Sequence, residues 1–197
     1  MESPREAGAA VAERLFFGLP VPGEVAARLR LVQEEFRPVL RSASWVRASN
    51  FHVTLRFVGD AERAGRERIV AELAREMTGG CPFTVSLRGV GVFPGPRAPR
   101  VLWADCATPW TALERLYERI EAALSRAGWP PAKEAFRAHV TLARIRRPAG
   151  PGSALTTVIE RFMGTDFGAW PVSDLVLFRS HLRPDGAVYE VVQRFAV

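Results

Sequence analysis

The chain contains little cysteine, lysine, tyrosine and histidine. Only two of its 197 residues are cysteines, Cys81 and Cys106, and their spacing matches neither a zinc site nor a disulfide framework. We therefore expect both to be reduced side chains in a cytoplasmic protein. No apolar run approaches the ~20 residues needed to span a bilayer. The N-terminal residues also lack the basic and apolar regions of a secretion signal, so we expect neither membrane insertion nor export.

Positive charge is carried almost entirely by arginine, because Lys133 is the only lysine. The formal net charge is +6 and the calculated pI about 10.5. Arginine binds phosphate through paired hydrogen bonds and stacks on bases, so the bias favours a polyanionic partner. A genomic base composition that favours arginine codons would explain the bias equally well.

Two of the three histidines lie in copies of one tetrapeptide. His52-Val53-Thr54-Leu55 recurs as His139-Val140-Thr141-Leu142, and each copy lies in an apolar, β-branched run typical of a strand. Because side chains alternate along a strand, the histidine and threonine of each copy share one face. Two such strands facing each other would form a pocket with two imidazoles and two hydroxyls. The third histidine, His181, belongs to no such motif, and we expect it near the surface.

These groups suit the opening of a cyclic phosphodiester. A base must activate water and an acid must protonate the departing oxygen, on opposite sides of phosphorus because attack and departure are roughly in line. Histidine titrates nearest neutral pH, so one imidazole can be neutral and the other protonated. This predicts a bell-shaped pH dependence around neutral pH. Hydroxyls can donate hydrogen bonds to the non-bridging oxygens, and we expect no metal or other cofactor.

The motifs and their surroundings resemble the 2H phosphoesterase superfamily and, within it, the RNA 2′,3′-cyclic phosphodiesterase (2′-5′ RNA ligase-like) family. The stretches that carry the resemblance follow the family's order at residues 14–19, 52–59, 89–94, 100–103, 136–144, 177–180 and 189–191. The resemblance implies a bilobal α+β fold, in which two pseudo-symmetric antiparallel sheets face a central groove with helices outside. The first and last parts of the chain would form one lobe and the middle the other.

The resemblance also implies an activity, the hydrolysis of RNA 2′,3′-cyclic phosphate ends to 2′-phosphomonoesters. It implies that His52 is the proton donor and His139 the proton acceptor, although the nearly identical motifs do not themselves assign these roles. Thr54 and Thr141 are predicted to bind the phosphate. The expected partners are RNA ends or cyclic nucleotides, bound by a monomer.

Two arginines are candidate substrate-binding residues. The resemblance implies this role for Arg144, at its offset after the second motif. Strand alternation places Arg144 on the face opposite His139, so a twist, a bulge or the strand end must turn it back. Arg56 is the second candidate because alternation places it on the face of His52.

Three other functions stay open. One is ligation of RNA ends through a 2′-5′ linkage, which is the same chemistry in reverse. Another is a non-catalytic nucleotide- or RNA-binding module that retains the pocket. The third is a pair of metal-binding histidines, although no carboxylate or cysteine ligand recurs beside the two motifs.

The remaining patterns predict a flexible tail at residues 1–11 and a single bilobal domain at 12–197. Besides the two motif strands, strands are predicted near 13–19, 82–93, 100–106, 172–180 and 188–196. Helices are predicted at 22–38, 61–77, 109–127 and 153–164.

Overall fold

The computed structural model describes residues 12–79, 82–133, 136–146, 153–183 and 186–197. The tail predicted at residues 1–11 lies outside the described residues. Nine strands are present in this part of the chain: β1 (Glu13–Pro20), β2 (Ala43–Trp45), β3 (His52–Ala61), β4 (Thr84–Phe93), β5 (Val101–Cys106), β6 (His139–Ile145), β7 (Asp166–Pro171), β8 (Asp174–Arg183) and β9 (Gly186–Ala196). The helices are α1 (Gly23–Phe36), α2 (Arg63–Glu76), α3 (Trp110–Arg126) and α4 (Ser153–Phe162), with a short 3₁₀ helix η1 (Ala48–Asn50).

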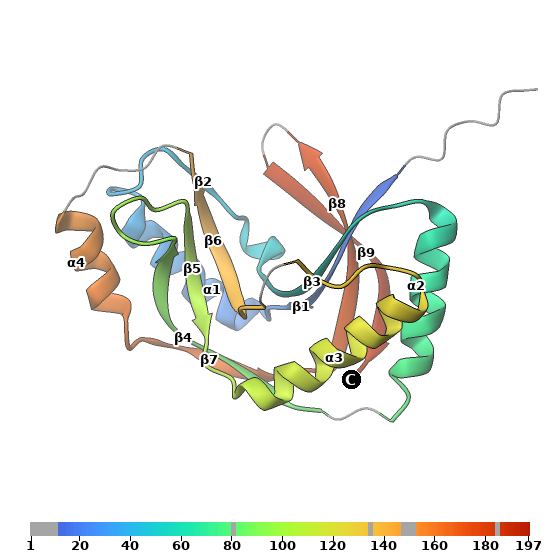
Figure 1. Cartoon of the computed structure of the whole chain (residues 1–197). Helices are drawn as coiled ribbons and strands as arrows, with labels where there is room; N and C mark the ends of the chain where they lie inside the picture. Colours follow the sequence, from blue (N-terminus) through green and yellow to red (C-terminus); the bar gives the residue numbers. More distant parts are fainter. Residues whose placement is uncertain (1–11, 80–81, 134–135, 147–152, 184–185) are drawn as a thin grey trace, which may run out of the picture.

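The strands form one curled, antiparallel sheet in the order β7-β4-β5-β6-β3-β1-β8-β9, with β2 added on β6. Between β3 and β6 the ladder holds a single residue pair, Val53 with Val140. Apart from β2, the sheet therefore consists of two four-stranded halves that meet at the two motif strands (Figure 1). One half joins the first and last strands of the chain and the other contains the middle, as predicted. The halves are continuous through the motif strands and are not two separate sheets.

The helices cover the convex side of the sheet in two pairs (Figure 1). Helices α2 and α3 pack on each other and on β3, whereas α1 packs against β6, β7 and α4. Helix α1 therefore follows β1 in the chain but covers the opposite half. Its Leu29 and Phe36 are fully buried. Because α1 packs on the half that does not contain β1, it buries apolar surface that links the two halves of the sheet.

The structure confirms the predicted helices and the long strands to within a few residues, but two strands were missed. Strand β2 has three residues, too few to show alternation. Strand β7 contains Gly168 and ends at Pro171, so its sequence resembles a turn. It forms because it pairs with β4 and buries Phe167 and Trp170. Among the described residues, no helix has the length and apolar character required to cross a membrane.

Candidate active site

Each motif strand contains a one-residue bulge at the leucine of its motif. In the pairing of β3 with β1, the register skips Leu55, and in the pairing of β6 with β5 it skips Leu142. A bulge puts two consecutive residues on one face and so reverses the alternation that follows. The two bulges occupy the same position in both motifs, three residues after the histidine.

The bulge in β6 returns Arg144 to the face of His139. Arg144 lies opposite Val101 and Thr141 lies opposite Trp103 on the neighbouring strand, so both project to one side. The charge of Arg144 acts on both motif histidines. Its side chain is exposed. The sequence required a twist, a bulge or the strand end to turn Arg144 back to the face of His139, and the bulge does so.

The bulge in β3 has the opposite effect on Arg56, and the predicted parity of Arg56 with His52 is wrong. Arg56 lies opposite Phe17, a fully buried core residue, and therefore projects to the helix side. Its guanidinium pairs with Glu121 of α3 and donates to the Pro130 carbonyl at 2.6 Å. Phe57 replaces it on the concave face.

A buried glutamine donates hydrogen bonds to backbone carbonyls at the bulge in β6. Gln33 of α1 is 3% exposed. Its Nε2 donates to the carbonyls of Leu142 and Val46, both at 2.8 Å. The Val46 amide also donates to the Leu142 carbonyl at 3.0 Å. These bonds connect α1 and the segment after β2 to the bulge that orients Arg144.

Both motif histidines are held in the same way by the backbone. The Nδ1–H of His52 donates to the Asn50 carbonyl at 2.7 Å, and that of His139 donates to the Arg137 carbonyl at 2.8 Å. Because a carbonyl only accepts, each neutral imidazole carries its proton on Nδ1 and its lone pair on Nε2. Each Nε2 is therefore the atom available for proton transfer.

The walls around the two histidines differ. His52 lies against Phe16, with ring centroids 4.8 Å apart, and meets Tyr189 edge-on at 5.1 Å. His139 meets Phe93 edge-on at 5.3 Å. One imidazole is thus enclosed by uncharged aromatic rings, and the other adjoins a wall that also carries a cation.

That cation is Arg137, whose Cζ lies 4.8 Å from the ring centres of both Phe93 and Trp103. The two rings stack at 4.7 Å. Gly91 is required here, because a Cβ at this position would lie 2.4 Å from Cζ2 of Trp103. Arg137 is not among the residues predicted for the site, although it lies two residues before the second histidine and its carbonyl orients that ring.

The pKa of both histidines is lowered. Burial lowers the pKa of His52 to about 4, with further contributions from the charges of His139 and Arg144. Burial also lowers the pKa of His139, and the nearby charges of Arg137 and Arg144 act in the same direction. In the protein alone, both imidazoles are therefore neutral at pH 7.

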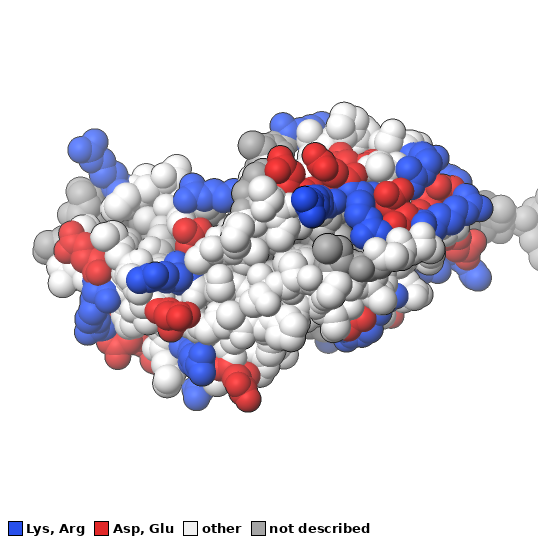
Figure 2. Space-filling view, turned by 90° about the horizontal axis from the view of Figure 1, so that it is seen from below, with Lys and Arg blue, Asp and Glu red and all other residues white. Residues whose placement is uncertain are grey.

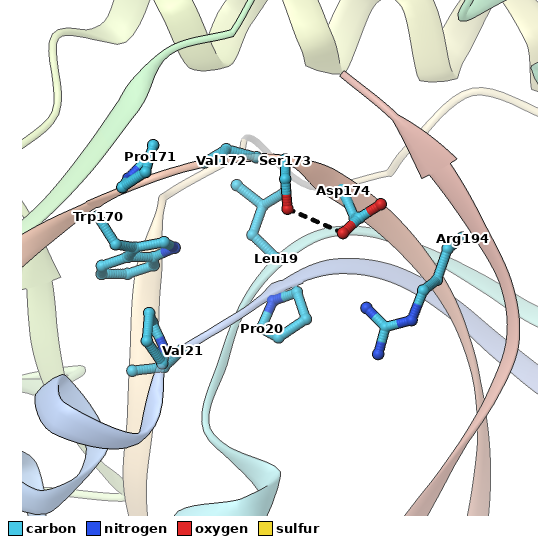
Figure 3. A pocket seen from close by; sticks show the side chains of 10 residues that line it. Leu19, Pro20, Val21, Trp170, Pro171, Val172, Ser173, Asp174 and Arg194 are labelled. Atoms are coloured by element: carbon cyan, nitrogen blue, oxygen red, sulfur yellow. Dashed lines mark hydrogen bonds between the residues drawn. The ribbon is translucent and has the colours of Figure 1, made fainter.

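A cavity of about 690 Å³ opens beside Thr54 and His139, between β3 and residues 129–133 and 136–137. Its described lining includes the aromatic residues Phe57, Phe93, Tyr117, Trp129 and Phe136. Three cationic side chains, Arg56, Lys133 and Arg137, also line it. A smaller cavity of about 220 Å³ lies at the ends of β1 and β7 (Figure 3). None of the motif residues lines it, whereas Thr54, Leu55 and His139 line the larger cavity.

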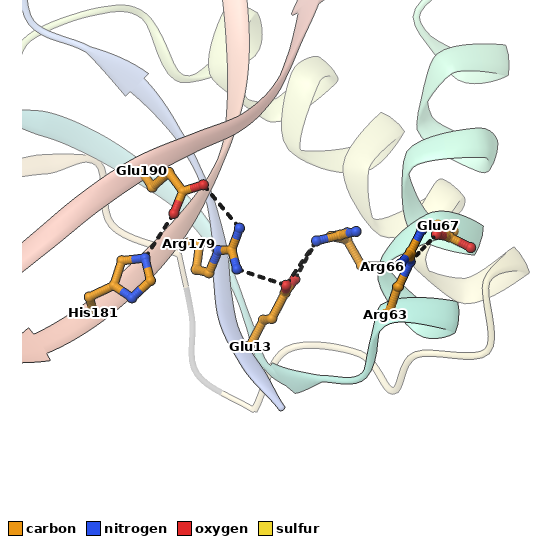
Figure 4. Close-up of polar contacts among 7 residues, drawn as sticks. All are labelled: Glu13, Arg63, Arg66, Glu67, Arg179, His181 and Glu190. Atoms are coloured by element: carbon orange, nitrogen blue, oxygen red, sulfur yellow. Dashed lines mark hydrogen bonds and ion pairs between the residues drawn. The ribbon is translucent and has the colours of Figure 1, made fainter. Parts of the chain in front are cut away.

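The third histidine lies in a different environment. His181 Nε2 is 2.9 Å from Glu190 Oε2, and Arg179 bridges Glu190 and Glu13 (Figure 4). Arg66 of α2 also pairs with Glu13 at 2.8 Å. This surface cluster contains no residue of either motif, in agreement with the expected position of His181.

Positive and negative side chains interleave on the face shown in Figure 2. On the helices, Arg126 pairs with both Glu72 and Glu76. By contrast, no carboxylate among the described residues pairs with Arg137 or Arg144. Within the described residues, both guanidiniums therefore act on His139 without a carboxylate partner of their own.

No group of three or more histidine, cysteine, aspartate or glutamate side chains suited to a metal ion occurs in the described part of the chain. The metal independence expected from the sequence stays a prediction. The roles predicted for the two histidines, Thr54 and Thr141 also stay predictions, although Thr54 and His139 border one cavity.

Comparison with known proteins places this chain in a defined family. The family model described as LigT like Phosphoesterase matches residues 19–103 and 108–189. This chain belongs to the LigT-like phosphoesterase family, a group of two-histidine (2H) phosphoesterases. It is thus similar to enzymes that act on phosphate esters.

Individual relatives are similar over most of the chain. A protein of Aeropyrum pernix named RNA 2′,3′-cyclic phosphodiesterase is 34% identical over 149 residues, which cover 75% of this chain and 82% of the relative. A protein of the same name from Thermus thermophilus is 31% identical over 193 residues, covering 93% and 90%.

Solved structures agree on the fold. The crystal structure of TT0787 of Thermus thermophilus is 33% identical with a TM-score of 0.77, covering 93% of this chain and 97% of that one. Escherichia coli LigT complexed with 3′-AMP is 23% identical with a TM-score of 0.76, covering 95% and 99%. At that identity, the second likeness supports the fold alone.

Proposed function

We propose that this protein hydrolyses RNA 2′,3′-cyclic phosphate ends to 2′-phosphomonoesters without a metal ion. The observation that carries the proposal is the matched pair of imidazoles, each with Nδ1 bonded to a backbone carbonyl and Nε2 left for proton transfer. The names of the relatives from Aeropyrum pernix and Thermus thermophilus support the same substrate class.

In the proposed reaction, Nε2 of His139 accepts a proton from water as the water oxygen forms a bond to phosphorus. The bond from phosphorus to O3′ breaks, and the protonated Nε2 of His52 donates a proton to O3′. Attack and departure lie roughly in line, which requires the two groups on opposite sides of phosphorus. The product retains the phosphate on O2′.

The hydroxyls of Thr54 and Thr141 donate to the non-bridging oxygens, and Arg144 supplies a cation for the negative charge. The substrate anion also affects protonation. A negative phosphate beside the imidazoles favours their charged forms, which offsets the lowering of pKa in the protein alone. The bound substrate thereby helps to protonate the donor that its own hydrolysis requires.

The test is to incubate the protein in EDTA with an RNA oligomer that ends in a 2′,3′-cyclic phosphate. The expected product is the 2′-phosphomonoester, and the His139→Ala variant should form almost none. A 3′-phosphate product would overturn the assignment of the broken bond. Loss of activity in EDTA that a divalent metal restores would overturn the metal-free mechanism.

The same assay separates the other functions. Adding a concentrated RNA with a free 5′-hydroxyl end would reveal ligation as a longer product, with a ribose hydroxyl replacing water. Binding of the oligomer without any change in its end would instead indicate a non-catalytic module.

A further inference from the structure

Arginine and carboxylate side chains are distributed unevenly along the chain. Three segments, residues 37–51, 86–104 and 136–146, contain nine arginines and no aspartate or glutamate. Of the 27 basic and 21 acidic residues, the rest of the chain therefore holds 18 and all 21, a formal charge of −3. A codon bias would enrich arginine throughout the chain and would not remove carboxylates from particular segments. The excess positive charge thus belongs to these three segments.

The fold brings parts of the three segments to one corner of the sheet (Figure 1). Strands β2 and β5 both pair with β6 at Arg144. The Arg100 guanidinium, just before β5, donates to the Arg146 carbonyl, just after β6, at 3.3 Å. Arg41 lies two residues before β2, and Arg97 lies between β4 and β5. All five side chains are exposed, and we call this group the arginine corner.

No described carboxylate forms an ion pair with the arginine corner. The side chains of Arg41 and Arg100 donate to backbone carbonyls instead. The other half of the sheet differs, because Arg179 of β8 is neutralised by Glu13 and Glu190. The two ends of the groove are therefore electrostatically unequal, and only the middle half of the chain offers a cluster of uncompensated cations.

We infer that the arginine corner binds backbone phosphates of the RNA that lies upstream of the cyclic phosphate end. The inference rests on the proposed function and adds the direction in which the RNA leaves the site, across the middle half of the sheet. Arg144 belongs to the corner and also lies on the face of His139, so this surface begins at the candidate site. Guanidiniums bind phosphates through paired hydrogen bonds, and contacts with the backbone accept any base sequence.

The experiment replaces the four arginines of the corner other than Arg144 with glutamine, in the variant Arg41→Gln/Arg97→Gln/Arg100→Gln/Arg146→Gln. The substrates are an RNA oligomer that ends in a 2′,3′-cyclic phosphate and uridine 2′,3′-cyclic phosphate, which has no upstream phosphate. KM for the oligomer should rise roughly ten-fold or more at low salt, and the slope of log KM against log salt should fall by about 3, from about 0.7 per phosphate contact. KM for the mononucleotide should stay unchanged.

Two further variants separate the arginine corner from net charge and from local folding. The matched control replaces four exposed arginines of α1, α2, α3 and β9 with glutamine, in the variant Arg30→Gln/Arg68→Gln/Arg115→Gln/Arg194→Gln. Its net charge changes equally, and it should retain the wild-type slope. Lysine at the four positions of the corner keeps the charge and should retain most of the slope.

Equal losses for oligomer and mononucleotide, or the same loss in the control variant, would overturn the inference. Binding of acidic phospholipid vesicles through the arginine corner, with unchanged KM for the oligomer, would also overturn it. If the wild-type protein hydrolyses neither substrate, the proposed function fails, and fluorescence anisotropy with an RNA oligomer that ends in a 3′-hydroxyl still tests the corner. Weaker binding by the corner variant than by the control would support the inference on its own, and equal binding would overturn it.

Discussion

At the scale of single residues, the site depends on what surrounds each imidazole. The backbone carbonyls two residues upstream set the same tautomer in His52 and His139. The two side chains nevertheless differ, because aromatic rings enclose the first and arginines approach the second. Identical tetrapeptides thus place their two imidazoles in chemically distinct surroundings.

Replacing either motif histidine with alanine should lower turnover of a cyclic-phosphate end by ~10²–10⁴-fold, the usual contribution of a general acid or base. The double variant should lose little more than either single one, because the pair acts as a unit. Single-turnover kinetics measure the effect and thermal unfolding checks the fold. His181→Ala is the control and should retain wild-type turnover. Near-normal turnover of His52→Ala or His139→Ala would contradict the paired mechanism.

The pH dependence of kcat/KM should peak below pH 6.5, on the acid side of the neutral optimum predicted from sequence. The free enzyme must hold one proton on the histidine pair. That one-proton form is most populated between about pH 4, the pKa of His52, and the lowered pKa of His139. In the free enzyme its proton lies mainly on His139, so the arrangement with His52 protonated is a minor form of the same one-proton state, and the profile keeps the same two limits. Profiles of initial rates at low substrate concentration measure it.

Arg144→Met provides the internal check on this explanation. The guanidinium lowers the pKa of both histidines, so its removal should move both limbs of the profile to higher pH. An unchanged profile in this variant would show that Arg144 does not act on the histidine pair.

At the scale of secondary structure elements, the bulges determine which side chains enter the groove. They return Arg144 to the face of His139 and turn Arg56 toward Glu121 of α3, although both residues follow their motifs closely. Gln33 connects the bulge of β6 to helix α1 through two buried hydrogen bonds. Helix α1 therefore supports the site without contacting the reacting groups.

Gln33→Leu should lower the free energy of unfolding by about 1–3 kcal/mol, because it removes the donor from buried carbonyls. Urea unfolding measures the change, and kcat/KM should fall as the strand around Arg144 loses its support. Gln193→Leu is the control, since the Gln193 side chain bonds only an exposed backbone carbonyl. The expected change there is within about 0.5 kcal/mol. Similar losses in both variants would argue against a specific role for Gln33.

At the scale of the whole molecule, the two halves share one sheet and one continuous hydrophobic core. The core reaches from β1 and α1 to β7 and β8, so the halves are expected to unfold together. A single bilobal domain over residues 12–197 stays a prediction that this continuity supports.

Acid should destabilise the fold partly through His52. The folded-state pKa of about 4 lies below the unfolded value of about 6.5. The unfolded chain therefore binds the extra proton first, and stability falls as the pH falls from 6.5 toward 4. The contribution is at most about 3 kcal/mol, from about 1.36 kcal/mol per pKa unit. Urea unfolding across this pH range measures it.

His52→Asn should remove this part of the acid sensitivity and leave the rest. The lowered pKa values of Glu67 and Glu190 also make stability fall at acid pH, but they do so in both proteins. The difference between the two stability curves therefore isolates His52. Parallel curves would show that His52 titrates alike in the folded and unfolded chains.

The sequence by itself determined the long strands, the helices and the pairing of imidazole with hydroxyl. Alternation and helical spacing depend on neighbouring residues, so they are readable without a structure. The repeated tetrapeptide marked the site, and the position of Arg144 showed that some irregularity had to turn it.

Only the tertiary structure decided where the bulges in the two motif strands lie. Alternation placed Arg56 beside His52, and the bulge at Leu55 reversed that assignment. Strand register depends on partners distant in the chain: Gln33 and Leu142, for example, are 109 residues apart. The cavity beside Phe57 also forms between segments that are far apart in sequence. Local patterns specify which face a side chain takes within a regular strand, but packing against remote elements decides where that regularity is interrupted.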